Sequence, residues 1–284
     1  MDMVGFGSRA RWSRHERGVD TVCPAPDGAP MNATVARICR YPVKGMNAED
    51  LERVALEPGM GLPHDRRFAI AHATTRFDPG APEWLPKSSF LMLMKNERLA
   101  RLEAAFDDAA GDLTIKRGGK QVSRGKVTQP LGRAMIGDFF AAYLKDECAG
   151  KPRLVEGSEG HMFSDTPARV LSVINLASVR DLERVVGKPV DPLRFRANIY
   201  VEGAYPWEEF HWIGEEITIG DVAFTVEGRI NRCAAINVDP ATAARDLNIP
   251  KDLMRGYGHV DVGVYAAVTR GGTIAVSDDV TASN

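Results

Sequence analysis

The chain has 284 residues, of which 44% are hydrophobic and 26% are charged, so it is long enough to bury a sizeable core and to form two domains. Its formal net charge of −2 argues against a general nucleic-acid binder, and any anion site must therefore be a local concentration of arginine and lysine. The sequence contains no apolar run of roughly 18 residues, which excludes a transmembrane helix and gives no reason to expect a membrane partner.

The four cysteines are widely separated and form no Cys-x-x-Cys pair. This spacing indicates neither a zinc cage nor a disulfide framework, and it favours a cytoplasmic location. Residues 1–30 are mostly polar or small and lack the apolar centre of a signal peptide. We expect a disordered extension there; the alternative is a mitochondrial-type presequence, which the arginines favour and the acidic residues oppose.

The first half of the chain is predicted to be rich in short strands. From residue 34, apolar runs alternate with prolines and glycines, which is typical of a small barrel or sandwich with close turns. Lys44 follows the first run and Arg66 precedes the third, and either alone could be an ordinary solvated charge. Residues 72–88 are predicted to be a loop, which is either a lid over a pocket or a surface excursion. A hairpin around two adjacent glycines and a helix over 136–144 complete this half.

The second half mixes strands with shorter helices, and we place the domain boundary near residue 150. The predicted elements are strands at 153–155, 170–174 and 193–201, a helix through residue 186 that Asn175 caps and Gly187 closes, a hairpin at 217–226, helical pieces at 241–247 and 251–255, and a hairpin of 260–268 with 273–276. In the loop before the second strand, Asp165 and Thr166 fit an ordinary Asx or Ser/Thr turn.

Two arginines are predicted to share a face of one strand. Arg194 and Arg196 are two residues apart within 193–201, and alternate residues of a strand point to the same side. Because a guanidinium binds phosphate through two hydrogen bonds, this pair suits an anionic ligand. A barrel rim with surface arginines would give the same pattern.

Cys233 is the most suggestive single residue, since it lies where the strand around 222–226 passes into a loop. The pair at 239–240, Asp-Pro, predicts the start of a helix beyond it. One interpretation is a small buried hydrophobic residue. The other is a thiolate favoured by Arg229 and Arg232, which could ligate a soft metal. If the backbone is extended, however, Arg232 points away from Cys233.

Four motifs, in order, resemble those of one known family. They are Tyr41-Pro42-Val43-Lys44-Gly45, Asp65-Arg66-Arg67-Phe68, the Arg-x-Asn of Phe195-Arg196-Ala197-Asn198-Ile199, and Asn231-Arg232-Cys233 with Val238-Asp239-Pro240. The last resembles the cysteine motif of the MOSC domain, named for the C-terminal domain of molybdenum cofactor sulfurase. The others resemble the amidoxime-reducing component and its bacterial relatives. The resemblance implies a mainly β (α+β) fold with a few helices, in which a small MOSC N-terminal β-barrel domain at 31–150 precedes a MOSC β-barrel domain at 151–281.

The resemblance also implies a cofactor and its site. Relatives bind a molybdenum cofactor (Mo-molybdopterin), and by this likeness Cys233 is expected to be the metal ligand and the catalytic residue. The expected cofactor-binding residues are a basic collar for the pterin phosphate, a hydrogen-bonding set and the arginine of the cysteine motif: Lys44, Arg66, Arg194 and Arg196; Asp165, Thr166 and Asn198; and Arg232.

The implied activity is reduction of N-oxygenated small molecules, such as N-hydroxylated bases. No flavin, nicotinamide or iron-sulfur motif is recognised, so electrons must come from a separate protein such as a ferredoxin, a cytochrome b5-like protein or a flavoprotein reductase. The alternative is a sulfur carrier or cofactor-maturation protein, with a persulfide on Cys233 supplied by a pyridoxal-phosphate-dependent cysteine desulfurase. A third reading, a protein-interaction module with an inert cysteine, would make the four motifs accidental.

Two departures limit what the resemblance implies. Gly45 stands where relatives often have serine, so one hydrogen bond to the cofactor would be missing or would come from the backbone. Residues 84–96 match the family poorly, and substrate selection is therefore not transferable.

Overall fold

A computed structural model describes residues 33–158 and 160–282, and strands dominate both ranges. Within them lie three α-helices, which confirms the predicted fold class of a mainly β protein with a few helices. None of these helices has the length and apolar character needed to cross a bilayer. The extension predicted at residues 1–30 lies outside the described residues.

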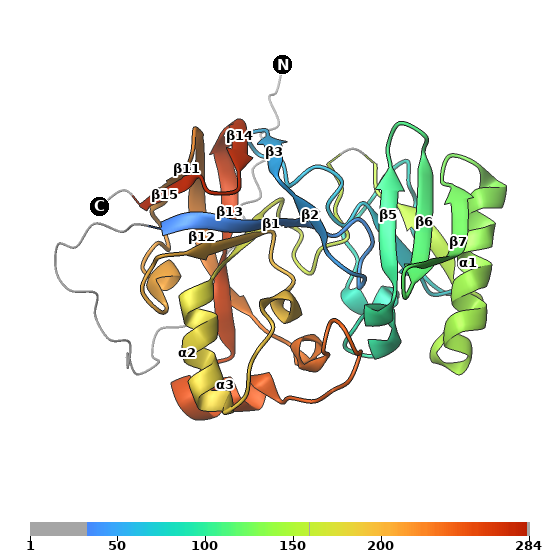
Figure 1. Ribbon diagram of the computed structural model, residues 1–284. Coiled ribbons are helices and arrows are strands. Elements are labelled where there is room, and N and C mark those ends of the chain that lie inside the picture. The colour runs from blue at the N-terminus through green and yellow to red at the C-terminus, as the bar shows by residue number, and fades with distance from the viewer. Residues whose placement is uncertain (1–32, 159, 283–284) are drawn as a thin grey trace, which may run out of the picture.

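Seven strands close into a barrel, seen on the left of Figure 1. In order around the barrel they are β1 (Ala33–Arg40), β10 (Ile199–Glu202), β9 (Leu171–Asn175), β13 (Asp261–Arg270), β12 (Val222–Asn231), β11 (Glu216–Ile219) and β15 (Asp279–Ala282). The β9–β10 pair is parallel, and β15 returns to β1 to complete the ring. Alternation on β12 buries Val222, Phe224 and Val226 in the barrel core, as the apolar pattern predicts.

The rest of the chain forms a second β-rich part, at the right of Figure 1. It consists of the three-stranded sheet β5 (Glu103–Asp107), β6 (Asp112–Arg117) and β7 (Lys120–Lys126), the pair β4 (Phe68–Ala71) with β8 (Arg153–Glu156), and α1 (Pro130–Leu144). The helix packs closely on β7, because a Cβ on Gly125 would lie only 2.2 Å from the carbonyl oxygen of Gly132. Phe68, Leu113 and Phe140 share the core beneath it.

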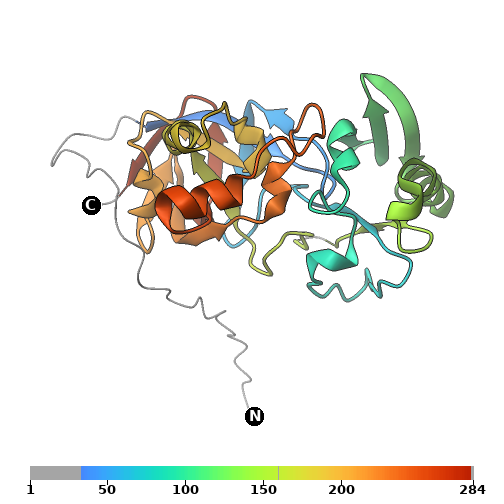
Figure 2. The same ribbon diagram turned by 90° about the horizontal axis from the view of Figure 1, so that it is seen from below.

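Short elements connect the two parts and cover the barrel. Strand β2 (Glu49–Leu51) extends the barrel sheet beside β1, and β3 (Arg53–Leu56) pairs with β14 (Gly272–Ala275). Helices α2 (Leu176–Val186) and α3 (Ile249–Tyr257) lie side by side against the barrel (Figure 2). The 3-10 helices are η1 (Lys87–Ser89), η2 (Glu97–Arg101), η3 (Lys145–Glu147), η4 (Pro192–Phe195), η5 (Glu208–Phe210) and η6 (Ala234–Asn237).

Local signals predicted several boundaries correctly. Asn175 caps α2 by accepting a hydrogen bond from the amide of Ala177, and Gly187 ends the helix in the left-handed region at φ 75°. Helix α1 begins six residues earlier than expected, at Pro130 (136 − 130 = 6), because proline at the first helical position already has the required φ.

Three predicted elements are wrong. The segment 193–201 is not one strand, because the Asp191 carboxylate caps η4 and only Ile199–Glu202 is extended. Strand β14 pairs with β3 rather than with β13. No helix forms at 241–247, because the chain turns back at Ala243, where φ is 61°. Only the pairing of β14 with β3 reflects a tertiary contact; the other two errors come from a local cap and a local turn that the apolar pattern does not show.

Candidate functional site

The nine residues predicted to form the site line one cavity of about 560 Å³. They come from separate segments: the turn after β1, the loop before β4, the loop before β9, the turn after η4, and the end of β12. They are Lys44, Arg66, Asp165, Thr166, Arg194, Arg196, Asn198, Arg232 and Cys233. Folding therefore brings together residues almost 190 positions apart (233 − 44 = 189), although their individual binding roles stay predictions.

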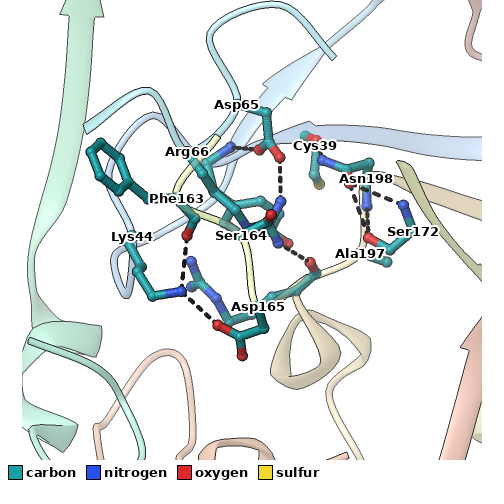
Figure 3. A network of polar contacts seen from close by, with 12 residues as sticks. Cys39, Lys44, Asp65, Arg66, Phe163, Ser164, Asp165, Ser172, Ala197 and Asn198 are labelled. Atoms are coloured by element: carbon teal, nitrogen blue, oxygen red, sulfur yellow. Dashed lines mark hydrogen bonds and ion pairs between the residues drawn. The ribbon is translucent and has the colours of Figure 1, made fainter. Parts of the chain in front are cut away.

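Lys44 and Asp165 form an ion pair in the cavity wall (Figure 3). The ammonium is buried and lies 2.5 Å from the Asp165 carboxylate and 2.9 Å from the carbonyl oxygen of Phe163. Burial lowers the pKa of Lys44, and the carboxylate only partly offsets it. Burial would raise the pKa of Asp165, but Lys44 outweighs that effect and the pKa falls. The pair lies in the cavity lining, where it can orient a polar ligand.

Two of the predicted collar arginines are already balanced by carboxylates. Arg66 pairs with buried Asp65 and donates a hydrogen bond to the carbonyl oxygen of Arg196 at 3.0 Å (Figure 3). Arg194, which is almost fully buried, contacts Asp239 at 3.0 Å and Asp246 at 2.8 Å. The surrounding carboxylates hold these two guanidinium groups in the fold. Arg66 and Arg194 therefore add less net positive charge to the cavity than the sequence predicts.

Arg196 and Arg232 differ, because neither forms an ion pair with a carboxylate of the described residues; like Arg194, each also keeps one buried nitrogen without a hydrogen-bond partner there. Arg232 donates to the carbonyl oxygens of Val262 and Phe195, both at 2.8 Å, yet its second Nη is free. Arg196 donates to a backbone carbonyl of Met46, and its Nη2 is also free. Burial lowers the pKa of both guanidinium groups. Both arginines line the cavity, and guanidinium groups that no carboxylate neutralises are the chemistry expected of an anion site.

Asn198 and Thr166 are used by the fold itself. The Asn198 side-chain oxygen accepts hydrogen bonds from the amide and hydroxyl of Ser172, and its nitrogen donates to the carbonyl oxygen of Cys39 (Figure 3). Thr166 Oγ1 accepts from the amide of Ala168 in a local turn, at 3.3 Å. These contacts join β1, β9 and β10 and shape the loop before β9.

Cys233 is partly exposed and is the N-cap residue of η6, where its backbone is extended. Its backbone carbonyl oxygen accepts a hydrogen bond from the amide of Ile236. As expected for extended chain, the Arg232 guanidinium is directed to Phe195 and Val262 instead. Arg229 lines the cavity but stacks on Phe210, with its guanidinium carbon 4.2 Å from the ring centroid.

Lys87 is the cation beside the thiol, and sequence reasoning missed it. Burial opposes its charge, but its contacts with Cys233 and Asp165 outweigh burial and raise the pKa of the ammonium. Its Nζ lies 3.8 Å from the Asp165 carboxylate. Lys87 belongs to the loop at 72–88, which the sequence predicted to be either a lid over a pocket or a surface excursion. Trp84 of the same loop lines the cavity, so this segment is part of the site.

Gly45 occupies a position where a serine would be strained. Its φ is 84°, and a Cβ there would lie 3.1 Å from Leu99 Cδ1. Glycine adopts this backbone conformation readily, so the chain has glycine here at no cost in strain.

The cavity fits a metal that brings most of its own ligands. Among the described residues no group of three or more His, Cys, Asp or Glu side chains could hold a metal ion, so Cys233 would be a single protein ligand. A pterin dithiolene with a phosphate would supply further sulfur ligands and an anion for Arg196 and Arg232. The two arginines and the thiol of Cys233, which line one cavity, therefore fit a molybdenum cofactor.

Comparison with protein families agrees with this geometry. Residues 32–147 match the MOSC N-terminal beta barrel domain, and residues 159–281 match the MOSC domain. The chain belongs to the MOSC family. The predicted domain boundary near residue 150 stays a prediction.

Several curated proteins are similar to this MOSC protein. The molybdenum cofactor sulfurase of Bos taurus is 40% identical over 275 residues, which cover 84% of this chain and 31% of that protein. The mitochondrial amidoxime-reducing component 1 of Homo sapiens is 31% identical over 131 residues, covering 42% of this chain and 37% of that protein. The matches thus span less than two fifths of these relatives. The YuaD protein of Bacillus subtilis aligns with 89% of this chain and 96% of its own, at 12% identity and a TM-score of 0.42.

Proposed function

We propose that this MOSC protein binds a molybdenum cofactor in the cavity and reduces N-oxygenated small molecules. The observation that carries the proposal is that Arg196 and Arg232, two arginines without an ion-pair partner among the described residues, line one cavity with the Cys233 thiol. The two arginines would bind the pterin phosphate, and Cys233 would hold the metal through its sulfur. Lys44 and Asp165 would orient the pterin ring.

The bound cofactor supplies two-electron oxo transfer. In the overall reaction the N–O bond breaks, two electrons and two protons are consumed, and the reduced nitrogen base leaves with one water. An amidoxime would thus give an amidine. The electrons would come from a separate redox protein, for example a ferredoxin, a cytochrome b5-like protein or a flavoprotein reductase. A cytoplasmic location remains our expectation.

A sulfur-carrier function is the second candidate, and the position of Lys87 supports it as well as it supports the reductase. A cation beside Cys233 would stabilise the anionic terminal sulfur of a persulfide as well as a thiolate. In that case a pyridoxal-phosphate-dependent cysteine desulfurase would be the partner, and the chain would mature the cofactor instead of turning over a substrate.

Metal content distinguishes the two functions. Molybdenum is measured by elemental mass spectrometry on wild type, Cys233→Ser and the control Cys148→Ser, all purified from a host that loads a known molybdoenzyme. The control thiol is partly exposed and does not line the cavity.

We expect near-stoichiometric metal in wild type and in Cys148→Ser, and a loss of most of it in Cys233→Ser. Metal-free protein in all three samples, with labile sulfane sulfur that depends on Cys233, would instead support the carrier.

A further inference from the structure

The part of the cavity lining that departs from the family pattern is largely apolar. Residues 84–94, here called the cavity segment, contribute Trp84, Met92, Leu93 and Met94 to the wall, together with Lys87. Methionine side chains are flexible and polarisable, and they adapt to aromatic ligands of varied shape. The cavity segment therefore supplies a surface for an apolar body close to the thiol.

Trp84 is held at the rim of the cavity. Its side chain remains 42% exposed, and its indole Nε1 donates to the carbonyl oxygen of Ser164 at 3.3 Å. Among the described residues, it is the exposed large hydrophobic side chain that lines this cavity; Leu131 and Met254, for example, lie elsewhere. An exposed tryptophan anchored by one hydrogen bond presents a rigid face for stacking.

Both ends of the cavity segment are fastened near Cys233. The Lys87 ammonium lies 3.8 Å from the Asp165 carboxylate, and the nearby Cys233 sulfur helps to raise its pKa. At the other end Arg245 donates to the carbonyl oxygens of Leu93 at 3.0 Å and Met94 at 2.9 Å, and its other Nη donates to that of Ala234 at 3.4 Å. Ala234 directly follows Cys233, so one guanidinium joins the methionine wall to the loop that bears the thiol.

The charges in the cavity also affect which substrates can bind, through the net charge of the substrate. Within residues 33–158 and 160–282, Lys87 has one close carboxylate, the Asp165 that it shares with Lys44, and Arg229 has none. A positively charged substrate would be repelled there, whereas a neutral one would not.

We propose that the preferred substrates are neutral N-oxygenated compounds with a planar aromatic body, which stacks on Trp84 and the methionines of the cavity segment. This inference rests on the proposed reductase function for its chemistry, but its binding part can be tested separately.

The test compares benzamidoxime with acetamidoxime, which share the reacting group and differ in the ring. Steady-state kcat and KM are measured on molybdenum-loaded wild type, Trp84→Ala and Leu131→Ala, with a chemical electron donor. Equilibrium dialysis of both compounds, without a donor, gives binding independently of turnover. Leu131 is 71% exposed on α1, outside the cavity, and serves as the matched control.

We expect kcat/KM for benzamidoxime to exceed that for acetamidoxime at least tenfold in wild type and in Leu131→Ala. In Trp84→Ala this ratio should fall about tenfold through KM, with little change in either kcat. Dialysis should show the same preference for the ring compound and its loss in Trp84→Ala.

Equal use of the two compounds by wild type, or a preference that survives Trp84→Ala, would overturn the inference while leaving the reductase intact. If the loaded protein reduces neither compound, the reductase proposal fails. Equilibrium dialysis then tests the aromatic site alone. Tighter binding of benzamidoxime than of acetamidoxime that is lost in Trp84→Ala would support the site, and any other result would overturn it.

Discussion

Glu209 is a buried carboxyl whose ionisation should cost stability, and the effect can be worked out from its surroundings. The residue lies in η5 with no exposed surface, and Ser178 donates a hydrogen bond to one carboxyl oxygen at 2.7 Å. The other oxygen has no partner. Burial raises the pKa of Glu209 to about 7, and the Ser178 hydrogen bond offsets only part of the shift.

The sign follows from proton binding. Between the ordinary pKa of a glutamate and about 7, the folded state holds a proton that the unfolded state has lost, so stability falls as pH rises through this window. A shift of one pKa unit corresponds to roughly 1.4 kcal/mol, and the full loss is therefore about 3 kcal/mol, complete above pH ~8. Below the unfolded pKa the proton is bound in both states and the effect vanishes.

The assay is urea unfolding of wild type, Glu209→Gln and the exposed control Glu216→Gln, at pH ~4.5 and pH ~8.5. Glutamine mimics the protonated acid, so the wild type should lose about 3 kcal/mol more than Glu209→Gln between the two pH values. Glu216→Gln should follow the wild type. The same pH dependence in wild type and Glu209→Gln would show that this carboxyl does not titrate in the window, and the reasoning would be wrong.

Two further predictions concern the walls of the cavity. Gly45→Ser should lower the free energy of unfolding by about 1–2 kcal/mol, since serine must adopt φ 84° with its Cβ 3.1 Å from Leu99. The control Gly59→Ser has φ 71° but open space, so equal urea midpoints would contradict a role for the contact. Arg245→Ala should cost about 1–2 kcal/mol and speed amide exchange in and just after the cavity segment, because the mutation removes its hydrogen bonds to the backbone. Arg270→Ala, which removes a guanidinium hydrogen bond elsewhere on the surface, is the control in hydrogen-exchange mass spectrometry, and unchanged exchange in Arg245→Ala would refute the fastening.

Local chemistry determined much of what the sequence could predict. Asn175 and Gly187 end a helix through their own side-chain and backbone preferences, so α2 was predictable to the residue. The turn at 118–119 and the alternation of β12 depend only on neighbours in sequence, and both hairpins formed as expected. The family motifs likewise lie in short contiguous blocks, so the MOSC family and the nine residues of the cavity wall could be named from sequence.

The tertiary structure decided the parts that depend on partners distant in sequence. Carboxylates elsewhere in the chain determine whether an arginine is neutralised: Asp239 and Asp246 form ion pairs with Arg194, whereas Arg232 donates to the carbonyl oxygens of Val262 and Phe195. The position of Lys87 near Cys233 has no local signal either, since the two residues are 146 positions apart (233 − 87 = 146). The sequence also left open whether the loop that bears Lys87 is a lid or a surface excursion. Hydrogen bonds and ion pairs between remote segments fix these features, and a periodic pattern along the chain carries no information about them.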